Sequence, residues 1–175
     1  MTRRFIVFGA GAIGGVVGAQ LIRRGVEVVL IARGAHADAL ESGGLRLEHG
    51  DDVETFHAPV ARHASDIDWR DDDVVFLAVK SQDTLAAVRD LAAVAPASIA
   101  IVCAQNGVDN ERVVLRHFAH VYVCVVMMPT AHLEPGVVQA HAWPIPGLLA
   151  VGCYPAGVDK NASTDVPPFP DPRFN

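Results

Sequence analysis

Short, uninterrupted runs of apolar residues recur along the chain, separated by glycines and polar segments. Five of these runs predict buried strands, at residues 4–8, 26–31, 74–79, 99–103 and 121–126. They lack the polar alternation of a half-exposed strand, which is typical of a parallel sheet covered on both faces. Shorter runs predict additional edge strands or hairpins, at residues 45–48, 53–56, 137–140 and 148–151.

Helices are predicted between these runs. Residues 13–24 follow a glycine-rich turn, are apolar almost all round at their start, and end in two arginines before Gly25, a helix-stop signal. A second helix is predicted from Ser81, as its N-cap, to about residue 94. Shorter helices are predicted at residues 36–42 and after Asp109. The alternation predicts a doubly wound α/β fold of the Rossmann type, with a mostly parallel sheet and additional edge strands.

The length of 175 residues has room for one ordinary domain, and 51% hydrophobic residues are ample for its core. We expect this domain to occupy residues 1–154. The 21 residues that follow hold five prolines and almost no periodicity. Residues 155–175 are therefore predicted to form a Pro-rich, disordered tail.

Charge and composition exclude several classes of function. A net charge of -6 without a Lys/Arg-rich run argues against a nucleic-acid surface, and no apolar stretch reaches the roughly 18 residues that a membrane span needs. The three cysteines, Cys103, Cys124 and Cys153, lie in apolar runs and are expected to be buried free thiols, which favours the cytoplasm. The histidines show no metal-ligand spacing, so no metal is expected. The acidic run at residues 71–73 is predicted to be a solvated loop.

A glycine-rich loop joins the first strand to the first helix. Its sequence matches the pattern G-x-G-x-x-G, in which the glycines permit a tight turn, close approach of a pyrophosphate and close helix packing. Amide groups and the positive end of the helix dipole then face the anion. A purely structural glycine turn is the alternative, but the position within a β-α-β unit favours dinucleotide binding. The predicted cofactor-binding residues here are Gly9, Ala10, Gly11, Ala12, Ile13 and Gly14.

Arg33 indicates which dinucleotide is bound. It stands 19 residues after Gly14, at the end of the second strand, where NAD-preferring sites carry an Asp or Glu. No carboxylate occupies Ala32 or Gly34. A guanidinium can bind a 2′-phosphate through two hydrogen bonds, so we predict NADP(H) as the cofactor. The alternative is a solvated surface arginine.

Lys80 and Asn106 follow the third and fourth strands. A lysine at a strand end is most often solvated, and Asn-Gly is most often a turn. Ligands of an open parallel sheet bind beyond the carboxyl ends of its strands, however. Both residues are therefore predicted to lie on the same sheet edge as the glycine loop and Arg33, where the cofactor runs.

At these positions the sequence resembles the ketopantoate reductase (2-dehydropantoate 2-reductase) family. The resemblance covers about residues 3 to 153, and the ordered set of Arg, Lys and Asn-Gly is more specific than the glycine loop. The matching segments are Phe8-Gly9-Ala10-Gly11-Ala12-Ile13-Gly14-Gly15, Leu30-Ile31-Ala32-Arg33-Gly34, Ala78-Val79-Lys80-Ser81-Gln82, Gln105-Asn106-Gly107, and Pro135-Gly136-Val137-Val138 with His141.

The resemblance implies NADPH-dependent reduction of 2-ketopantoate, or a related 2-keto acid, to the 2-hydroxy acid of pantothenate and coenzyme A biosynthesis. It implies that Arg33 binds the 2′-phosphate with help from Lys80, and that Asn106 reaches the nicotinamide side and the substrate. In the family, a helical carboxyl-terminal domain carries the general-acid lysine. We expect this domain to be absent, and Lys160, in the Pro-rich tail, is not given the lysine's role.

Two functions therefore stay open. The chain is either part of an oxidoreductase acting on a small-molecule keto acid, or an isolated or truncated NADP(H)-binding module without catalytic activity of its own. Neither nucleic acid nor membrane is expected as a partner. Self-association into a homo-oligomer is open.

Overall fold

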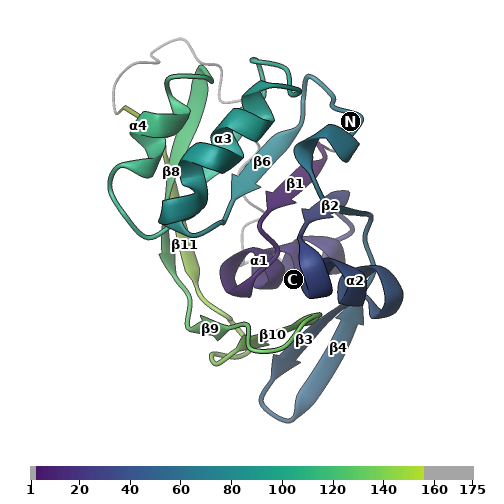
Figure 1. Ribbon diagram of the computed structural model, residues 1–175. Helices are drawn as coiled ribbons and strands as arrows, with labels where there is room; N and C mark the ends of the chain where they lie inside the picture. The colour runs from purple at the N-terminus through teal and green to yellow at the C-terminus, as the bar shows by residue number, and fades with distance from the viewer. Residues whose placement is uncertain (1–2, 156–175) are drawn as a thin grey trace.

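The computed structural model describes residues 3–155 (Figure 1). Within them, the main sheet has seven strands in the order β11-β8-β7-β6-β1-β2-β5. All pairings in it are parallel except that of β8 with β11. Counted along the chain, the parallel strands have the order 3-2-1-4-5-6, which is that of a Rossmann domain. The bounds are β1 Phe5–Phe8, β2 Val28–Ile31, β5 Val60–Ala61, β6 Val74–Leu77, β7 Ala100–Cys103, β8 His120–Met127 and β11 Leu148–Tyr154.

A second sheet holds three of the four predicted edge strands. Its order is β4 (Asp52–Phe56), β3 (Leu45–His49), β10 (Val137–Ala140) and β9 (Thr130–Ala131). The expectation of an edge strand was wrong for β3, because it pairs in parallel with β10 at the centre of this sheet, whereas β10 forms the hairpin alternative with β9. An apolar run shows that a strand is buried, but it does not show which distant segment lies beside it.

The helices begin and end close to the predicted bounds. They are α1 (Ala12–Arg23), α2 (Gly34–Gly43), α3 (Thr84–Ala92) and α4 (Asn110–Val114), with short 3-10 turns η1 (Ala64–Asp66) and η2 (Ser81–Asp83). Ser81 does not cap α3, because η2 comes first and the Ser81 hydroxyl donates to the carbonyl of Asn106 at 2.7 Å. Ser81 thus connects the segment after β6 to the loop after β7, instead of capping a helix.

Alternate residues of each main-sheet strand enter two separate cores. In β1, Phe5 and Val7 pack with α1, whereas Ile6 and Phe8 pack with α3 and α4. The core on the α1 side extends through the helix to Leu47 and other residues of the second sheet. Helix α1 therefore lies between two sheets, as Figure 1 shows, which explains why its start is apolar all round.

Two glycines permit this close packing of α1. A Cβ atom on Gly14 would lie 2.1 Å from the carbonyl oxygen of Gly9 and 2.9 Å from Val7 Cγ1, on the side of the main sheet. A Cβ atom on Gly15 would lie 2.6 Å from Val138 Cγ1, on the side of the second sheet. The helix thus approaches both sheets more closely than a larger residue would allow.

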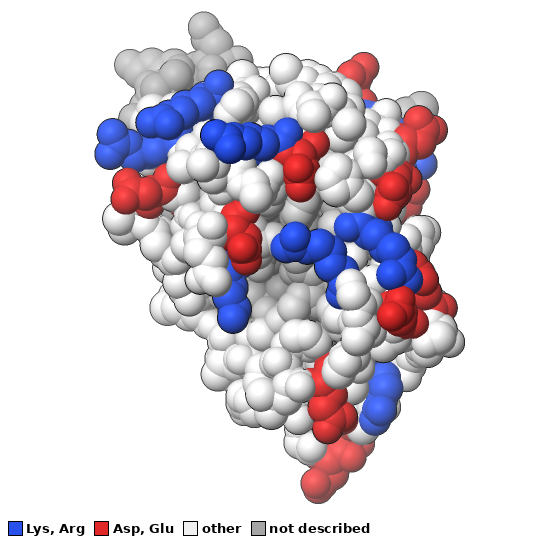
Figure 2. Space-filling view, viewed as in Figure 1, with Lys and Arg blue, Asp and Glu red and all other residues white. Residues whose placement is uncertain are grey.

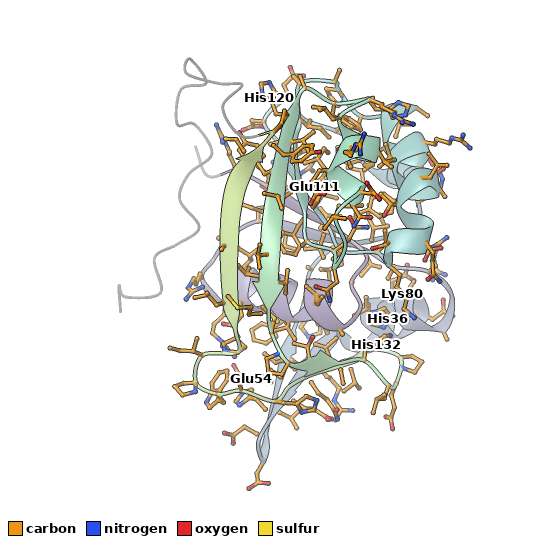
Figure 3. All side chains as sticks on the ribbon, turned by 90° about the vertical axis from the view of Figure 1, so that its left-hand side faces the viewer. His36, Glu54, Lys80, Glu111, His120 and His132 are labelled. Atoms are coloured by element: carbon orange, nitrogen blue, oxygen red, sulfur yellow. The ribbon has the colours of Figure 1, made fainter. Side chains whose placement is uncertain are left out.

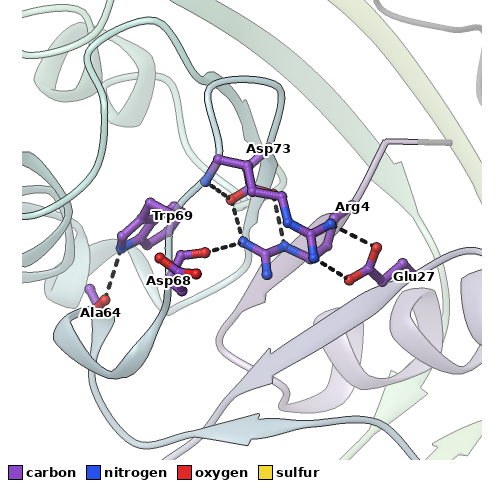
Figure 4. A network of polar contacts seen from close by, with 7 residues as sticks. Arg4, Glu27, Ala64, Asp68, Trp69 and Asp73 are labelled. Atoms are coloured by element: carbon purple, nitrogen blue, oxygen red, sulfur yellow. Dashed lines mark hydrogen bonds and ion pairs between the residues drawn. The ribbon is translucent and has the colours of Figure 1, made fainter. Parts of the chain in front are cut away.

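A buried ion pair joins β1 to the segment before β6 (Figure 4). Asp73 accepts hydrogen bonds from Arg4 Nε at 2.9 Å and Nη2 at 2.7 Å, and its side chain is fully buried. The prediction of a solvated acidic loop was therefore wrong for this residue. The carboxylate is buried because the guanidinium compensates its charge.

Cys103 and Cys124 are buried and free, as predicted, but Cys153 is exposed on β11. That strand lies at the edge of the sheet, where it pairs only with β8. In the part of the chain that the structure describes, no helix is long and apolar enough to cross a membrane. Of the predicted tail, only residue 155 lies within the described residues, so the domain boundary stays a prediction.

Candidate functional site

Four parallel strands end side by side, and the predicted site residues follow these ends. The register aligns Ile31 of β2 with Phe8 of β1, Phe8 with Leu77 of β6, and Leu77 with Cys103 of β7. The loops after these strands thus leave the sheet at one edge. The site residues just beyond the strand ends are Gly11, Arg33, Lys80 and Asn106. Figure 3 shows Lys80 at this end of the molecule and His120, at the start of β8, at the other.

The glycine loop has the geometry of an anion cradle. Gly9 has φ +101°, and a Cβ atom there would lie 2.9 Å from the amide nitrogen of Val79, so the loop passes directly against the end of β6. Gly11 precedes α1, no side chain caps the helix, and the space around a Cβ at Gly11 is open. The first-turn amides of Ala12, Ile13 and Gly14 can therefore receive a phosphate. These features fit a dinucleotide pyrophosphate.

His36 fixes this loop from outside and was not singled out from the sequence. Its Nε2 lies 2.8 Å from the carbonyl oxygen of Ala10, and its Nδ1 accepts a hydrogen bond from the amide of Gly136 at 2.9 Å. The ring of His132 lies 4.2 Å away, centroid to centroid. Desolvation, together with the smaller effect of nearby His132, lowers the pKa of His36. Nothing in the sequence pattern relates this histidine to a segment 100 residues away.

A pocket lies beside Arg33, between the strand ends and α3. Its apolar lining comes from Phe8, Ile31, Ala86 and Ala87, and its polar lining from Arg33, Arg62, His63, Asp83 and Asp90. Lys80 is not among the lining residues. Figure 2 shows basic side chains gathered near the middle of this face, between α3 and α2, with acidic side chains beside them. The structure thus associates Arg33 with Arg62 rather than with Lys80.

A buried polar network holds the loop that carries Asn106. Gln105 Nε2 donates to Thr84 Oγ1 at 2.6 Å, and Thr84 Oγ1 donates to Asn110 Oδ1 at 2.8 Å. Asn110 Nδ2 in turn donates to Ser81 Oγ at 3.2 Å, and Ser81 bonds the carbonyl of Asn106. Of these, Gln105 and Ser81 stood in the motif segments, Gln105 without a role and Ser81 only as the predicted helix cap. The network fixes the backbone of Asn106 relative to the start of α3.

Metal chemistry has no visible site in the described range 3–155, since no group of three His, Cys, Asp or Glu residues there could hold an ion. The strand order and the glycine loop at the start of α1 instead define a Rossmann-type domain with the phosphate loop of dinucleotide-binding proteins. That is the class of the protein.

The chain belongs to the ketopantoate reductase PanE/ApbA family, whose pattern matches residues 5–156. It is 28% identical over 158 residues to a 2-dehydropantoate 2-reductase of Pyrococcus abyssi, a match that covers 90% of this chain and 50% of the relative. A 2-dehydropantoate 2-reductase of Mesorhizobium japonicum is 37% identical over 106 residues, which cover 60% of this chain and 32% of the relative. The chain thus spans about half the length, or less, of these relatives.

Solved structures show the same fold. The crystal structure of a PanE/ApbA family ketopantoate reductase from Ralstonia eutropha JMP134 superimposes with a TM-score of 0.72 at 33% identity, covering 79% of this chain and 46% of that one. A 2-dehydropantoate 2-reductase from Porphyromonas gingivalis W83 gives a TM-score of 0.77 at 24% identity, over 87% of this chain and 55% of that one. The predicted fold class and family are therefore confirmed.

Proposed function

We propose that this chain is the NADP(H)-binding half of an oxidoreductase that reduces 2-ketopantoate, or a related 2-keto acid, to the 2-hydroxy acid. The observation that carries the proposal is the alignment of the glycine cradle, Arg33, Lys80 and Asn106 along one sheet edge. The family of the chain supports the reaction class. Bound NADPH supplies the hydride for such a reduction.

The residues of the chain have distinct roles in this proposal. Amides at the start of α1, which no side chain caps, bind the pyrophosphate. Arg33 binds the 2′-phosphate, and Lys80 adds a positive charge beyond the end of β6, two strands from β2. Asn106 follows β7, three strands from β2 along the carboxyl ends of the strands, and on the nicotinamide side its amide would bind the substrate. The buried network behind it holds that position.

A cofactor-binding module without turnover of its own is the second candidate. Reduction of a ketone places negative charge on its oxygen, which needs a proton donor. Lys80 is the only lysine in residues 3–155, and the proposal uses it for the cofactor. This favours binding without complete chemistry in this chain alone.

A titration with NADPH and NADH tests both candidates. We expect tighter binding of NADPH, and Arg33→Asp should weaken NADPH by about 10- to 100-fold, since a hydrogen bond between charged groups contributes about 1.5–3 kcal/mol. NADH should be affected far less. Arg116→Asp, an exposed charge reversal after α4, is the matched control.

Equal losses for the two coenzymes would remove Arg33 from the 2′-phosphate site. Ketopantoate is then added and the absorbance of the reduced cofactor is followed. Turnover would contradict the module and show that this chain itself supplies the proton donor, whereas binding without turnover would support the module.

A further inference from the structure

The pocket beside Arg33 contains a second arginine, at the end of β5, that no motif includes. We infer that Arg62 is a second guanidinium for the 2′-phosphate of NADP(H), and that this pocket receives the adenosine end of the cofactor. The inference rests on the proposed NADP(H) binding, which it extends to the specificity-determining residues of the site.

The lining of the pocket is divided by chemistry. Phe8 and Ile31, at the ends of β1 and β2, join Ala86 and Ala87 of α3 in an apolar surface that suits a planar base. Arg33 and Arg62 follow the neighbouring strands β2 and β5, so their charges lie on the strand side. A phosphate is attracted to that side.

The opposite wall carries carboxylates. Asp83 and Asp90 belong to η2 and α3, and Nε2 of His63, another lining residue, lies 3.5 Å from Oδ2 of Asp90. Carboxylates repel a phosphate but accept hydrogen bonds from an exocyclic amine, such as that of adenine. The two walls therefore orient adenosine 2′-phosphate in one direction, with the phosphate toward the arginines.

Arg62 is held in place before any ligand arrives. Its Nε donates to Glu41 Oε1 at 3.2 Å, and its Nη2 donates to Glu41 Oε2 at 2.7 Å and to Asp38 Oδ1 at 2.6 Å. These bonds use three of its five N–H groups, which leaves the two on Nη1 as donors among the described residues. The hydrogen bonds to Glu41 and Asp38 raise the pKa of Arg62 further above its usual range, so it remains a cation.

The two carboxylates also weaken the attraction of Arg62 for an anion. Its contribution to phosphate binding is therefore directional, through two fixed donors, and smaller than that of Arg33, for which no carboxylate contact is present among the described residues. The competing explanation is that Arg62 only stabilises the contact between β5 and α2. Binding data can separate the two explanations, because loss of a purely structural contact affects ligands with and without a 2′-phosphate alike.

The experiment measures binding of four ligands by calorimetry: NADPH, NADH, 2′,5′-ADP and 5′-ADP. We expect Arg62→Gln to weaken NADPH and 2′,5′-ADP by about 5- to 20-fold, as for the loss of a charge-assisted hydrogen bond. NADH and 5′-ADP should stay within about twofold of the wild type. Arg62→Lys, which keeps the charge but loses the planar guanidinium, should bind NADPH and 2′,5′-ADP with affinities between those of the wild type and Arg62→Gln.

Arg70→Gln is the matched control. The side chain of Arg70 is 49% exposed against 47% for Arg62, and it too is held by a carboxylate, that of Glu27. Its amide donates to Asp73, the partner of Arg4 just before the start of β6, away from the carboxyl ends of the strands. This variant should bind all four ligands like the wild type.

Four results would overturn the inference. If Arg62→Gln loses affinity equally for all four ligands, Arg62 has only a structural role. Unchanged affinities would exclude Arg62 from the site. A wild-type chain that binds NADPH no better than NADH would refute the 2′-phosphate site altogether. If the wild type binds none of the four ligands, the proposed function fails together with this inference.

Discussion

The two ring nitrogens of His36 have opposite roles, which fixes its protonation state. Nδ1 accepts from the amide of Gly136, so it carries no proton, and Nε2–H donates to the carbonyl of Ala10. A second proton would break the first bond. Desolvation, followed by the weaker effect of His132, lowers the pKa of His36 below its usual 6.5, although the bond to Ala10 opposes this shift.

The sign of the pH effect follows from this lowered pKa. Below about pH 6.5, His36 is protonated in the unfolded chain but still neutral in the folded chain. The free energy of unfolding therefore falls as the pH decreases toward the folded-state pKa. Above about pH 6.5 the contribution of His36 is fully present. Urea titrations at a series of pH values should show this loss, and it should be smaller in His36→Gln.

His120→Gln provides the control for that experiment. His120 is exposed at the far end of the sheet, so its replacement should leave the pH dependence as in the wild type (Figure 3). If the wild type and His36→Gln lose stability in parallel on acidification, His36 does not contribute to the pH dependence.

The three thiols should differ in reactivity. Burial raises the pKa of Cys103 to about 12 and that of Cys124 to about 11, so both are protonated and inaccessible. Cys153 is exposed. We expect a thiol reagent at mildly alkaline pH to modify one cysteine rapidly in the native chain and three in denaturant, with mass spectrometry to assign them. Rapid native modification of Cys103 would contradict the packing of β7 against α3 and α4.

Single residues also show where sequence patterns lose information. Asp73 and Cys153 each have the environment opposite to the one predicted, because burial depends on a partner that the local pattern does not contain. For Asp73 the partner is Arg4, 69 residues earlier. The glycine loop is different, since strand, turn and helix start are contiguous and the local sequence determines the geometry.

At the scale of elements, α1 depends on the small size of Gly15. Alanine has a higher helix propensity than glycine by about 1 kcal/mol, but its Cβ would lie 2.6 Å from Val138 Cγ1 and 2.9 Å from the carbonyl oxygen of Ala10. Overpacking of this kind costs about 1–3 kcal/mol, so we expect Gly15→Ala to lower the free energy of unfolding. Denaturant titration measures the change.

Gly43→Ala is the matched control, with the opposite expected sign. Gly43 is the last residue of α2 and no atom lies within 4 Å of a Cβ there, so propensity alone acts and the change should be neutral or stabilising by up to about 1 kcal/mol. Val138→Ala should recover part of the loss in the Gly15→Ala background. A Gly15→Ala variant as stable as the wild type would show that α1 and the second sheet separate easily.

The parallel sheet could be predicted from the sequence, but the second sheet could not. Each main-sheet strand is a contiguous apolar run, and the right-handed β-α-β connection limits the order of such strands to few alternatives. The pairing of β3 with β10 joins segments about 90 residues apart, with no connection rule between them. For the same reason His36 was absent from the predicted set. Arg62 was absent because β5, the strand it follows, has only two residues and was not predicted, whereas Arg33, Lys80 and Asn106 follow predicted strands.

At the scale of the whole molecule, both cores share the main sheet. The strands supply Val7 and Phe76 to one core and Ile6 and Val75 to the other, so neither core can separate without unpairing the same strands. The second sheet joins the first core through α1. We therefore expect the described residues to unfold in a single cooperative transition.

Cofactor binding should stabilise this whole unit rather than the loops alone. The residues proposed to bind NADPH follow β1, β2, β6 and β7, so loss of any of these strands destroys the site. NADPH at 100 times its dissociation constant should thus add about 2.7 kcal/mol to the free energy of unfolding. Thermal unfolding can be monitored by circular dichroism, which reports on the backbone, and by tryptophan fluorescence. The fluorescence reports on Trp69 beside η1 and on Trp143 beside His49 of the second sheet. The two unfolding midpoints should coincide, and NADPH should raise them together. Separate midpoints, with only one responding to NADPH, would mean that the second sheet is an independent unit and that α1 transmits no binding energy to it.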